Sequence, residues 1–346
     1  MGFFRRKKTN EDQEEKEVKV QTREKKKKEL QKPWEKKERI LVLFVFLLTV
    51  LSSSFLALSA REWKLPGLPR MNFDFSSLSL FKEETITIEG NREKVDRIKK
   101  SYEAISEFSN LTRDVSGVYG LYVLDLEGGS EFFNYGVNEN EIFKAASLIK
   151  LPVMLAMFEE EEKGRIDLET KYYLKDSDKV GGAGSLYYKP PGYEVSYRDL
   201  VKLMGKESDN TAYNISLKIL GEKKINDFMS KVGMEKTNIA ENKTTPREMG
   251  NLFRYLWFDM KDEMRKMELL DFLTDTSFEQ WITSGVPYGV RVSHKYGRET
   301  HTVNDAGIIF TEKPFVLVIM SKGVVEREAD RIIPEITKVI YGIKTR

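Results

Sequence analysis

The sequence predicts an α+β fold, in which an antiparallel five-stranded sheet is built from both ends of one globular domain. Three observations predict it: two strand patterns come early in the domain, three come near the C-terminus, and the chain between them is helical. Strands on either side of a long helical region pair most simply into one sheet, flanked by helices and with an inserted all-helical subdomain. The first 90 residues show none of these patterns.

The N-terminal segment combines a basic tail with an apolar run. Residues 1–39 carry 15 Lys and Arg against 9 Asp and Glu, and residues 40–60 (ILVLFVFLLTVLSSSFLALSA) carry no charge. At 1.5 Å per residue, 21 apolar residues are long enough to cross the hydrocarbon core of a membrane. We expect a transmembrane helix at 40–60 that contacts membrane lipid, with a cytoplasmic tail before it by the positive-inside rule.

A cleaved signal peptide is the alternative interpretation of this segment, because small residues near Ala60 resemble a cleavage site. A charged region of 39 residues is long for a signal peptide, and an apolar run of 21 exceeds the usual 7 to 15. We therefore favour an uncleaved anchor and an extracytoplasmic domain at the cell membrane.

The composition excludes several kinds of chemistry. The chain has no cysteine, which removes thiol nucleophiles, disulfides and thiolate metal sites, and its only two histidines, His294 and His301, are expected to be ordinary strand and loop residues. Because the whole chain carries only +2 and the tail alone is more positive, the rest is net negative. Nucleic-acid binding is disfavoured, and we expect no cofactor and no metal.

The globular domain is expected to span residues 91–346. Residues 61–90 mix Pro66, Gly67 and Pro69 with isolated aromatics, which is typical of a linker or stalk. Apolar residues then recur at three- and four-residue steps, which predicts an amphipathic helix; they are Val95, Ile98, Tyr102, Ile105 and Phe108.

The remaining elements follow from the same patterns. Residues 118–126 and 131–135 alternate across a Gly-containing turn and predict a hairpin, and a helical region extends from about 145 to 255. Further strands are expected at 290–297, 305–310 and 314–321, followed by a helix at 325–343.

Ser147 and Lys150 are candidate catalytic residues. They open an apolar helical segment (SLIKLPVMLAMF), and an i, i+3 spacing places them on one helix face. A serine hydroxyl needs a nearby base, and a lysine in apolar surroundings can have its pKa lowered enough to serve.

This pair alone is unspecific, but it is the first of three ordered motifs. Ser208-Asp209-Asn210 follows between helical segments, and Lys295-Tyr296-Gly297 ends a predicted strand. With all three in this order, residues 95–345 resemble the class A β-lactamases and penicillin-binding proteins. The resemblance implies a β-lactamase or D,D-peptidase-like fold and a serine acyl-enzyme.

The resemblance also implies roles for individual residues. Ser147 would attack an amide carbonyl with Lys150 as its activator, and Ser208 would relay a proton to the leaving nitrogen. Asp209 would support structure. The expected substrate contacts are Lys295 with a carboxylate, Asn210 with the side-chain amide, and Gly297 and Arg298 beside the oxyanion, which the backbone N–H groups of Ser147 and Arg298 would bind.

Two departures from the family pattern bear on function. Tyr296 stands where Thr or Ser is usual, and Arg298 and Glu299 replace small residues. The segment 234–243 is much shorter than the loop that carries the deacylating glutamate in hydrolysing class A enzymes. Glu241 is its one candidate substitute.

Three functions remain open on the sequence alone. The first is hydrolysis of β-lactams or related cyclic or terminal amides, and the second is a D,D-peptidase-like activity on peptidoglycan peptides with slow β-lactam turnover. The third is a membrane β-lactam sensor or binding protein, in which the tail of unknown partner reports acylation. Deacylation distinguishes the first from the second.

The protein should fractionate with membranes, with the domain from residue 91 outside the cytoplasm, because an uncharged run follows a positively charged tail. Protease added to intact cells should digest the domain and leave residues 1–39 protected. Loss of the tail with the domain intact would contradict this topology.

Overall fold

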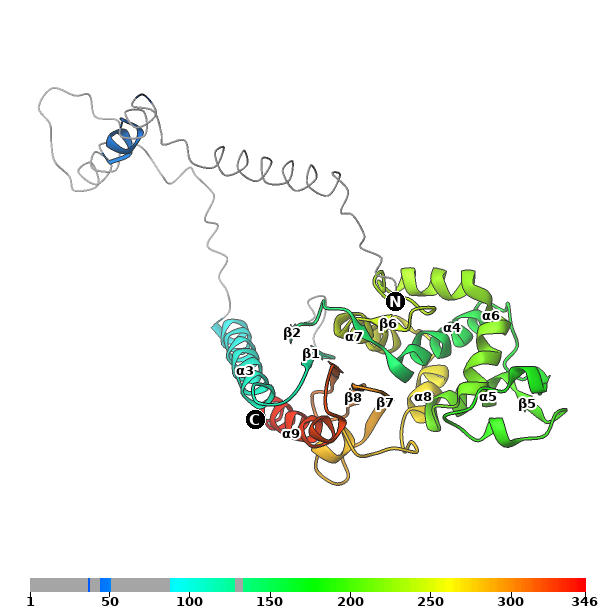
Figure 1. The fold of residues 1–346 in the computed structure, drawn as a ribbon. Coiled ribbons are helices and arrows are strands. Elements are labelled where there is room, and N and C mark those ends of the chain that lie inside the picture. Colours follow the sequence, from blue (N-terminus) through cyan, green and yellow to red (C-terminus); the bar gives the residue numbers. More distant parts are fainter. Residues whose placement is uncertain (1–36, 38–43, 51–87, 128–132) are drawn as a thin grey trace, which may run out of the picture. The chain divides into compact units, whose positions relative to one another are not determined.

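The predicted five-stranded sheet is confirmed. In the computed structural model, the strands lie in the order β2-β1-β9-β8-β7 and all pair antiparallel. Their bounds are β1 Val118–Asp125, β2 Asn134–Val137, β7 Val292–Glu299, β8 Thr302–Ile309 and β9 Phe315–Lys322. β1 pairs with β9 along its whole length, so strands from the two ends of the domain meet at the centre of the sheet (Figure 1).

The structure describes residue 37 and residues 44–50, 88–127 and 133–346. The chain divides into two units, Met1–Lys82 and Glu83–Arg346. Most of the expected transmembrane helix at 40–60, the linker at 61–90 apart from its last residues, and the turn of the β1–β2 hairpin therefore lie outside the described residues. Among the described residues, no helix has both the length and the apolarity to cross a membrane.

Apart from α8, the helices of the domain lie in the regions that the sequence predicts as helical. Their bounds are α3 Ile88–Thr112, α4 Lys150–Glu162, α5 Tyr197–Lys206, α6 Asn210–Lys231, α7 Pro246–Arg254, α8 Glu263–Phe272 and α9 Glu326–Lys344. The sequence analysis did not identify α8 or the short strands β3 Phe143–Lys144, β4 Lys171–Tyr173, β5 Glu194–Ser196 and β6 Lys243–Thr244. Two or three residues are too few to show an alternating pattern.

Helix starts follow the local sequence. Thr245 caps α7 by accepting a hydrogen bond from the backbone N–H of Glu248, and Pro246 occupies the first helical position, where its missing N–H is no loss. Asp262 caps α8 in the same way, through the N–H groups of Met264 and Arg265.

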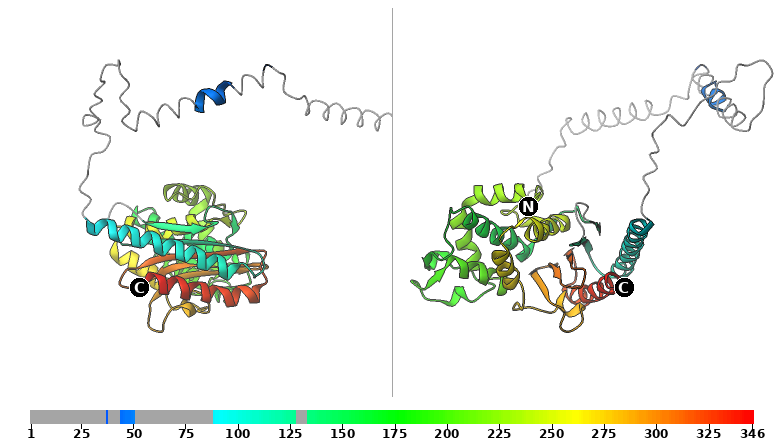
Figure 2. Two further views of the ribbon diagram at one scale, coloured as in Figure 1. Left: turned by 90° about the vertical axis from the view of Figure 1, so that its left-hand side faces the viewer. Right: turned by 180° about the vertical axis from the view of Figure 1, so that it is seen from behind.

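Both faces of the sheet are covered. Successive residues of a strand point to opposite sides of the sheet, so each strand contributes to two apolar cores. Leu121, Val123 and Leu317 join one apolar core with α3 and α9, which lie side by side across the sheet (Figure 2). Tyr122 and Val316 point the other way, into the core shared with the helical region. Every residue of β9 except its last is therefore buried.

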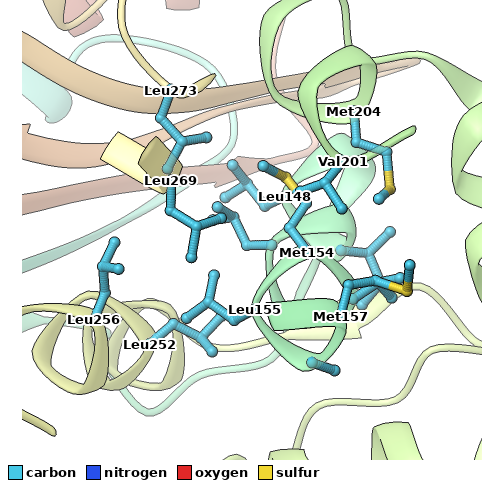
Figure 3. Packing of buried hydrophobic residues seen from close by; sticks show 14 of the residues in the cluster. Leu148, Met154, Leu155, Met157, Val201, Met204, Leu252, Leu256, Leu269 and Leu273 are labelled. Atoms are coloured by element: carbon cyan, nitrogen blue, oxygen red, sulfur yellow. The ribbon is translucent and has the colours of Figure 1, made fainter. Parts of the chain in front are cut away.

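α4 is the central helix of the second core. Its residues from Lys150 to Glu160 are all buried, as expected for a helix that is covered on all sides. Met154, Leu155 and Met157 meet side chains from α5, α7 and α8 (Figure 3). Burying each such side chain stabilises the fold by roughly 1.5–3 kcal/mol. This packing fixes the position of Lys150 at the start of the helix.

A buried ion pair links β7 to β8. The sequence analysis did not anticipate this ion pair. His294 Nδ1 lies 2.8 Å from Asp305 Oδ1 and its Nε2 lies 3.2 Å from Glu279 Oε1, with His294 and Asp305 fully buried. Burial opposes the imidazolium, but the Asp305 charge and the two hydrogen bonds outweigh it and raise the pKa of His294 to about 9. The ring is therefore charged at neutral pH.

Replacing His294 with Asn should lower the free energy of unfolding at pH 7 by about 3 kcal/mol, because Asp305 would keep a buried charge without its cation. Because the pKa of His294 is raised on folding, the charged ring contributes its full stabilisation to the wild-type protein below pH 6.5. This stabilisation is lost as the pH rises through about 9. Denaturant unfolding from pH 6 to 10 measures both effects.

His301→Asn is the matched control, since His301 is exposed and its φ of +57° suits Asn. It should change the stability by less than about 1 kcal/mol. Equal losses in the two variants, or a loss in His294→Asn that persists unchanged to pH 10, would contradict the assignment.

Candidate active site

Ser147 lies in a 3₁₀ helix, Ala146–Ile149, that leads directly into α4. The residue before it, Ala146, has a φ of +48°, a conformation that a non-glycine residue rarely adopts and that costs about 1–3 kcal/mol. Asn304 of β8 holds this turn by donating to the carbonyls of Lys144 and Ala145, at 2.8 and 3.1 Å. The strained backbone therefore presents Ser147 in one fixed orientation.

The structure brings three other predicted residues together around the Lys150 amine. Its Nζ donates to Ser147 Oγ at 2.9 Å, to Asn210 Oδ1 at 2.7 Å and, more weakly, to Ser208 Oγ at 3.4 Å. Three acceptors match the three protons of an ammonium group. In the neutral amine, the nitrogen lone pair is free to accept the Ser147 proton.

Burial lowers the pKa of Lys150 from its ordinary 10.5 to about 8, and the nearby charges of Asp209 and Glu299 partly offset this effect. The side chain is only 2% exposed, so desolvation of the ammonium group is the main cause. A useful fraction of the amine, about a tenth, is therefore neutral at pH 7.

The Ser208-Asp209-Asn210 segment forms the turn that leads into α6. Ser208 has a φ of +55°, and Asp209 caps α6 by accepting from the N–H group of Ala212 at 2.8 Å. Its other carboxylate oxygen accepts from the N–H group of Leu186, also at 2.8 Å. A Cβ on Gly184 would lie 2.1 Å from Asp209 Oδ2, so only glycine permits this approach. The predicted structural role of Asp209 is confirmed.

β7 runs past Ser147. A Cβ on Gly297 would lie 2.7 Å from the backbone nitrogen of Ser147, so the strand can lie this close only with glycine at that position. Arg298 turns its guanidinium away from Ser147 and pairs with Asp330 of α9, over the ring of Trp281. Only its backbone is available for the predicted oxyanion contact.

Lys295 is fully buried, and its Nζ donates to the Tyr296 carbonyl at 2.9 Å. Burial and, secondarily, the Lys150 charge hold the pKa of Lys295 well below its usual range. No hydrogen bond joins Lys295 to Ser147, Lys150 or Ser208 within the described part of the chain. Its predicted contact with a substrate carboxylate stays a prediction.

Glu241 does not join this hydrogen-bond network. It is exposed, its carboxylate pairs with Lys243, and that hydrogen bond lowers its pKa. Its backbone carbonyl accepts from Lys144 Nζ at 3.0 Å. In the described residues, no carboxylate forms a hydrogen bond with Ser147 or Lys150, and the role of Glu241 as a deacylation base stays a prediction.

Sequence reasoning missed two residues that shape the site. Tyr213 lies on α6 with its ring centroid 5.6 Å from Lys150 Nζ, and the sequence analysis assigned it no role. Asn304 anchors the Ser147 turn from inside a strand. A polar Asn that precedes Asp305 in an otherwise apolar strand was a signal that could have identified the anchor.

Comparisons with known proteins agree with this fold. Among solved structures, PBP-A is 24% identical over 71% of this chain and 96% of its own, with a TM-score of 0.65. A β-lactamase from Sphaerobacter thermophilus is 24% identical over 70% and 97%, with a TM-score of 0.64. One from Xanthomonas campestris pv. campestris is 20% identical over 71% and 98%, with a TM-score of 0.66. At these identities the likeness shows the fold alone.

The sequence itself matches a family model. No curated protein matches the chain. The model of the beta-lactamase enzyme family matches residues 103–343, which is well over half of the chain and includes all three motifs. The chain therefore belongs to the beta-lactamase enzyme family.

Proposed function

We propose that the protein is a class A β-lactamase-like serine hydrolase that acts on β-lactams or related cyclic or terminal amides through an acyl-enzyme on Ser147. One observation supports this most strongly. The buried amine of Lys150 contacts Ser147, Ser208 and Asn210 together, and its pKa is lowered to about 8. This arrangement can activate a serine at neutral pH.

Acylation follows from this geometry. Neutral Lys150 takes the proton of Ser147 Oγ as that oxygen bonds to the carbonyl carbon. The oxyanion then forms beside the backbone N–H groups of Ser147 and Arg298, each donor contributing roughly 3 kcal/mol. The proton returns through Ser208 to the leaving nitrogen as the C–N bond breaks.

Deacylation requires a base that activates water. The absence of a carboxylate hydrogen-bonded to Ser147 or Lys150 among the described residues supports a slow second step. This favours, as a second candidate, a penicillin-binding D,D-peptidase-like enzyme that acts on cell-wall peptides. A mutant of the structurally similar PBP-A has been captured as an acyl-enzyme complex with penicillin G.

We further propose a location at the cell membrane, with residues 40–60 as the anchor and the enzyme domain outside the cytoplasm. The apolar run and the basic tail support this topology. Wall peptides and β-lactams both occur on that side of the membrane. A sensor that only reports acylation would share the site and differ in its lack of turnover.

Incubation with penicillin should raise the intact mass by one ligand, and Ser147→Ala should abolish this increase, because Ser147 Oγ lies 2.9 Å from the Lys150 amine that would activate it. Lys150→Ala should be nearly as damaging, since groups that act as a unit are not additive. The acylation rate should rise with pH and level off above about pH 8.

Ser109→Ala is the matched control, because Ser109 is exposed and bonds only within α3. It should label like the wild type. Labelling that persists in Ser147→Ala would remove the nucleophile assignment, and a pH-independent acylation rate would remove Lys150 as the base.

Nitrocefin hydrolysis should show a burst of about one equivalent followed by a weak steady rate, because a missing general base typically slows deacylation by roughly 10²- to 10⁴-fold. Stopped-flow absorbance measures both phases. Glu241→Gln should leave the slow phase unchanged, as should Glu235→Gln, an exposed control in the same segment.

Two outcomes would contradict the proposal of slow deacylation. Rapid turnover without a burst, together with a trapped adduct in Glu241→Gln, would make Glu241 the base and the protein a true β-lactamase. Rapid turnover that neither variant changes would mean that Lys150 or Ser208 serves both steps.

A further inference from the structure

Tyr213 lies against Lys150 and also lines a cavity. It is on α6, three residues after Asn210, and its ring centroid is 5.6 Å from Lys150 Nζ. The same side chain lines a cavity of about 560 Å³ between α6 and residues 237–240. Lys150 itself is 2% exposed. The aromatic ring therefore covers the amine on the side of this cavity.

The cavity can hold water. Leu217, Ile225 and Ile239 form its apolar wall, while Glu222, Asn226 and Asn238 supply hydrogen-bonding groups. A polar cavity of this volume has room for several water molecules with the partners that they need. Removing the Tyr213 ring would let this water reach the amine.

The other groups near Lys150 would not shield its amine from water if the Tyr213 ring were removed. Ser147, Ser208 and Asn210 occupy its hydrogen-bonding positions. The charges that act on it are those of Asp209 and Glu299, while its own charge acts on Lys295, and both oxygens of Asp209 are engaged by backbone N–H groups. Desolvation thus dominates the electrostatics of the amine. The ring contributes to that desolvation, which outweighs the weak cation–π attraction expected at 5.6 Å.

We propose that Tyr213 is a positioning residue that keeps the cavity water away from Lys150 and from the ester on Ser147. Its ring preserves the neutral amine that acylation needs and slows hydrolysis of the acyl-enzyme. This role rests on the proposed function, because it requires a Ser147 ester. The phenol is not itself a base, since burial raises the pKa of Tyr213 to about 12.

In the hydrolysis that the ring restrains, a water oxygen bonds to the ester carbon and a water proton goes to the Lys150 amine. The bond between that carbon and Ser147 Oγ then breaks, and Lys150 returns the proton to Ser147. Ring removal therefore has two opposite effects. Hydration stabilises the ammonium form and slows acylation near pH 7, while access of water speeds deacylation.

The test compares Tyr213→Ala with Tyr213→Phe in the full-length protein. Tyr213→Ala should move the midpoint of the acylation pH profile up by about one unit. It should also shorten the half-life of the penicillin acyl-enzyme, followed by intact mass after a chase, by about tenfold. Tyr213→Phe keeps the ring and should retain the wild-type midpoint and half-life.

Leu217→Ala is the matched control, because it enlarges the same cavity one turn further along α6 without uncovering Lys150. It should change neither quantity. If Tyr213→Ala does not fold, as judged by thermal unfolding, Tyr213→Leu removes the aromatic face with a smaller loss of volume.

Failure of the proposed function is distinguishable from failure of this inference. If wild-type protein takes up no penicillin, the Lys150 titration is followed instead by NMR of ¹³C-lysine-labelled protein, with Lys150→Met for assignment. A higher midpoint in Tyr213→Ala than in the wild type would still support the role in covering the amine. Unchanged midpoint and half-life in Tyr213→Ala, or a Tyr213→Phe variant that behaves like Tyr213→Ala, would overturn the proposal.

Discussion

The burial of one amine is the constraint on which the rest of the site depends. Lys150 begins α4, a helix covered on all sides, and its Nζ is held by Ser147, Ser208 and Asn210. An ammonium group in such a position loses hydration, so its pKa falls to about 8. The apolar packing around α4 therefore also causes the lowered pKa on which the proposed chemistry of the site depends.

Strained backbone surrounds this amine. Ala146 and Ser208 both have positive φ. Ala146 directly precedes Ser147, and Ser208 is itself a hydrogen-bond partner of Lys150. Asn304 holds the first turn from β8, and the Asp209 cap holds the second at the start of α6. Anchors from the sheet and from the helical subdomain let the fold maintain conformations that would be unfavourable in a free chain.

β7 carries two buried basic side chains whose surroundings differ. His294 has Asp305 and Glu279 as partners, and its pKa is raised to about 9. Lys295, the next residue, bonds to a carbonyl and lies near the Lys150 charge, so its pKa is lowered. The carboxylates of Asp305 and Glu279 stabilise the charge of His294, whereas desolvation and the Lys150 charge disfavour a charge on Lys295. The ion pair joins β7 to β8 and supports the strand that runs past Ser147.

The sequence by itself determined the α+β order of elements, the single sheet built from both ends of the domain and the residues of the three motifs, because periodicity and local spacing carry that information. Which strands pair, with β1 beside β9, was decided by the tertiary structure. Tertiary structure alone decided the environment of each group. Burial lowers the pKa of Lys150 so that its amine is a potential base, and it places His294 in an ion pair with Asp305. Neither environment can be read from neighbours in the chain. The tertiary structure also placed Tyr213 against Lys150 and left Glu241 exposed beside Lys243. Contacts between different helices, strands and loops set most of these environments, and no sequence period encodes them.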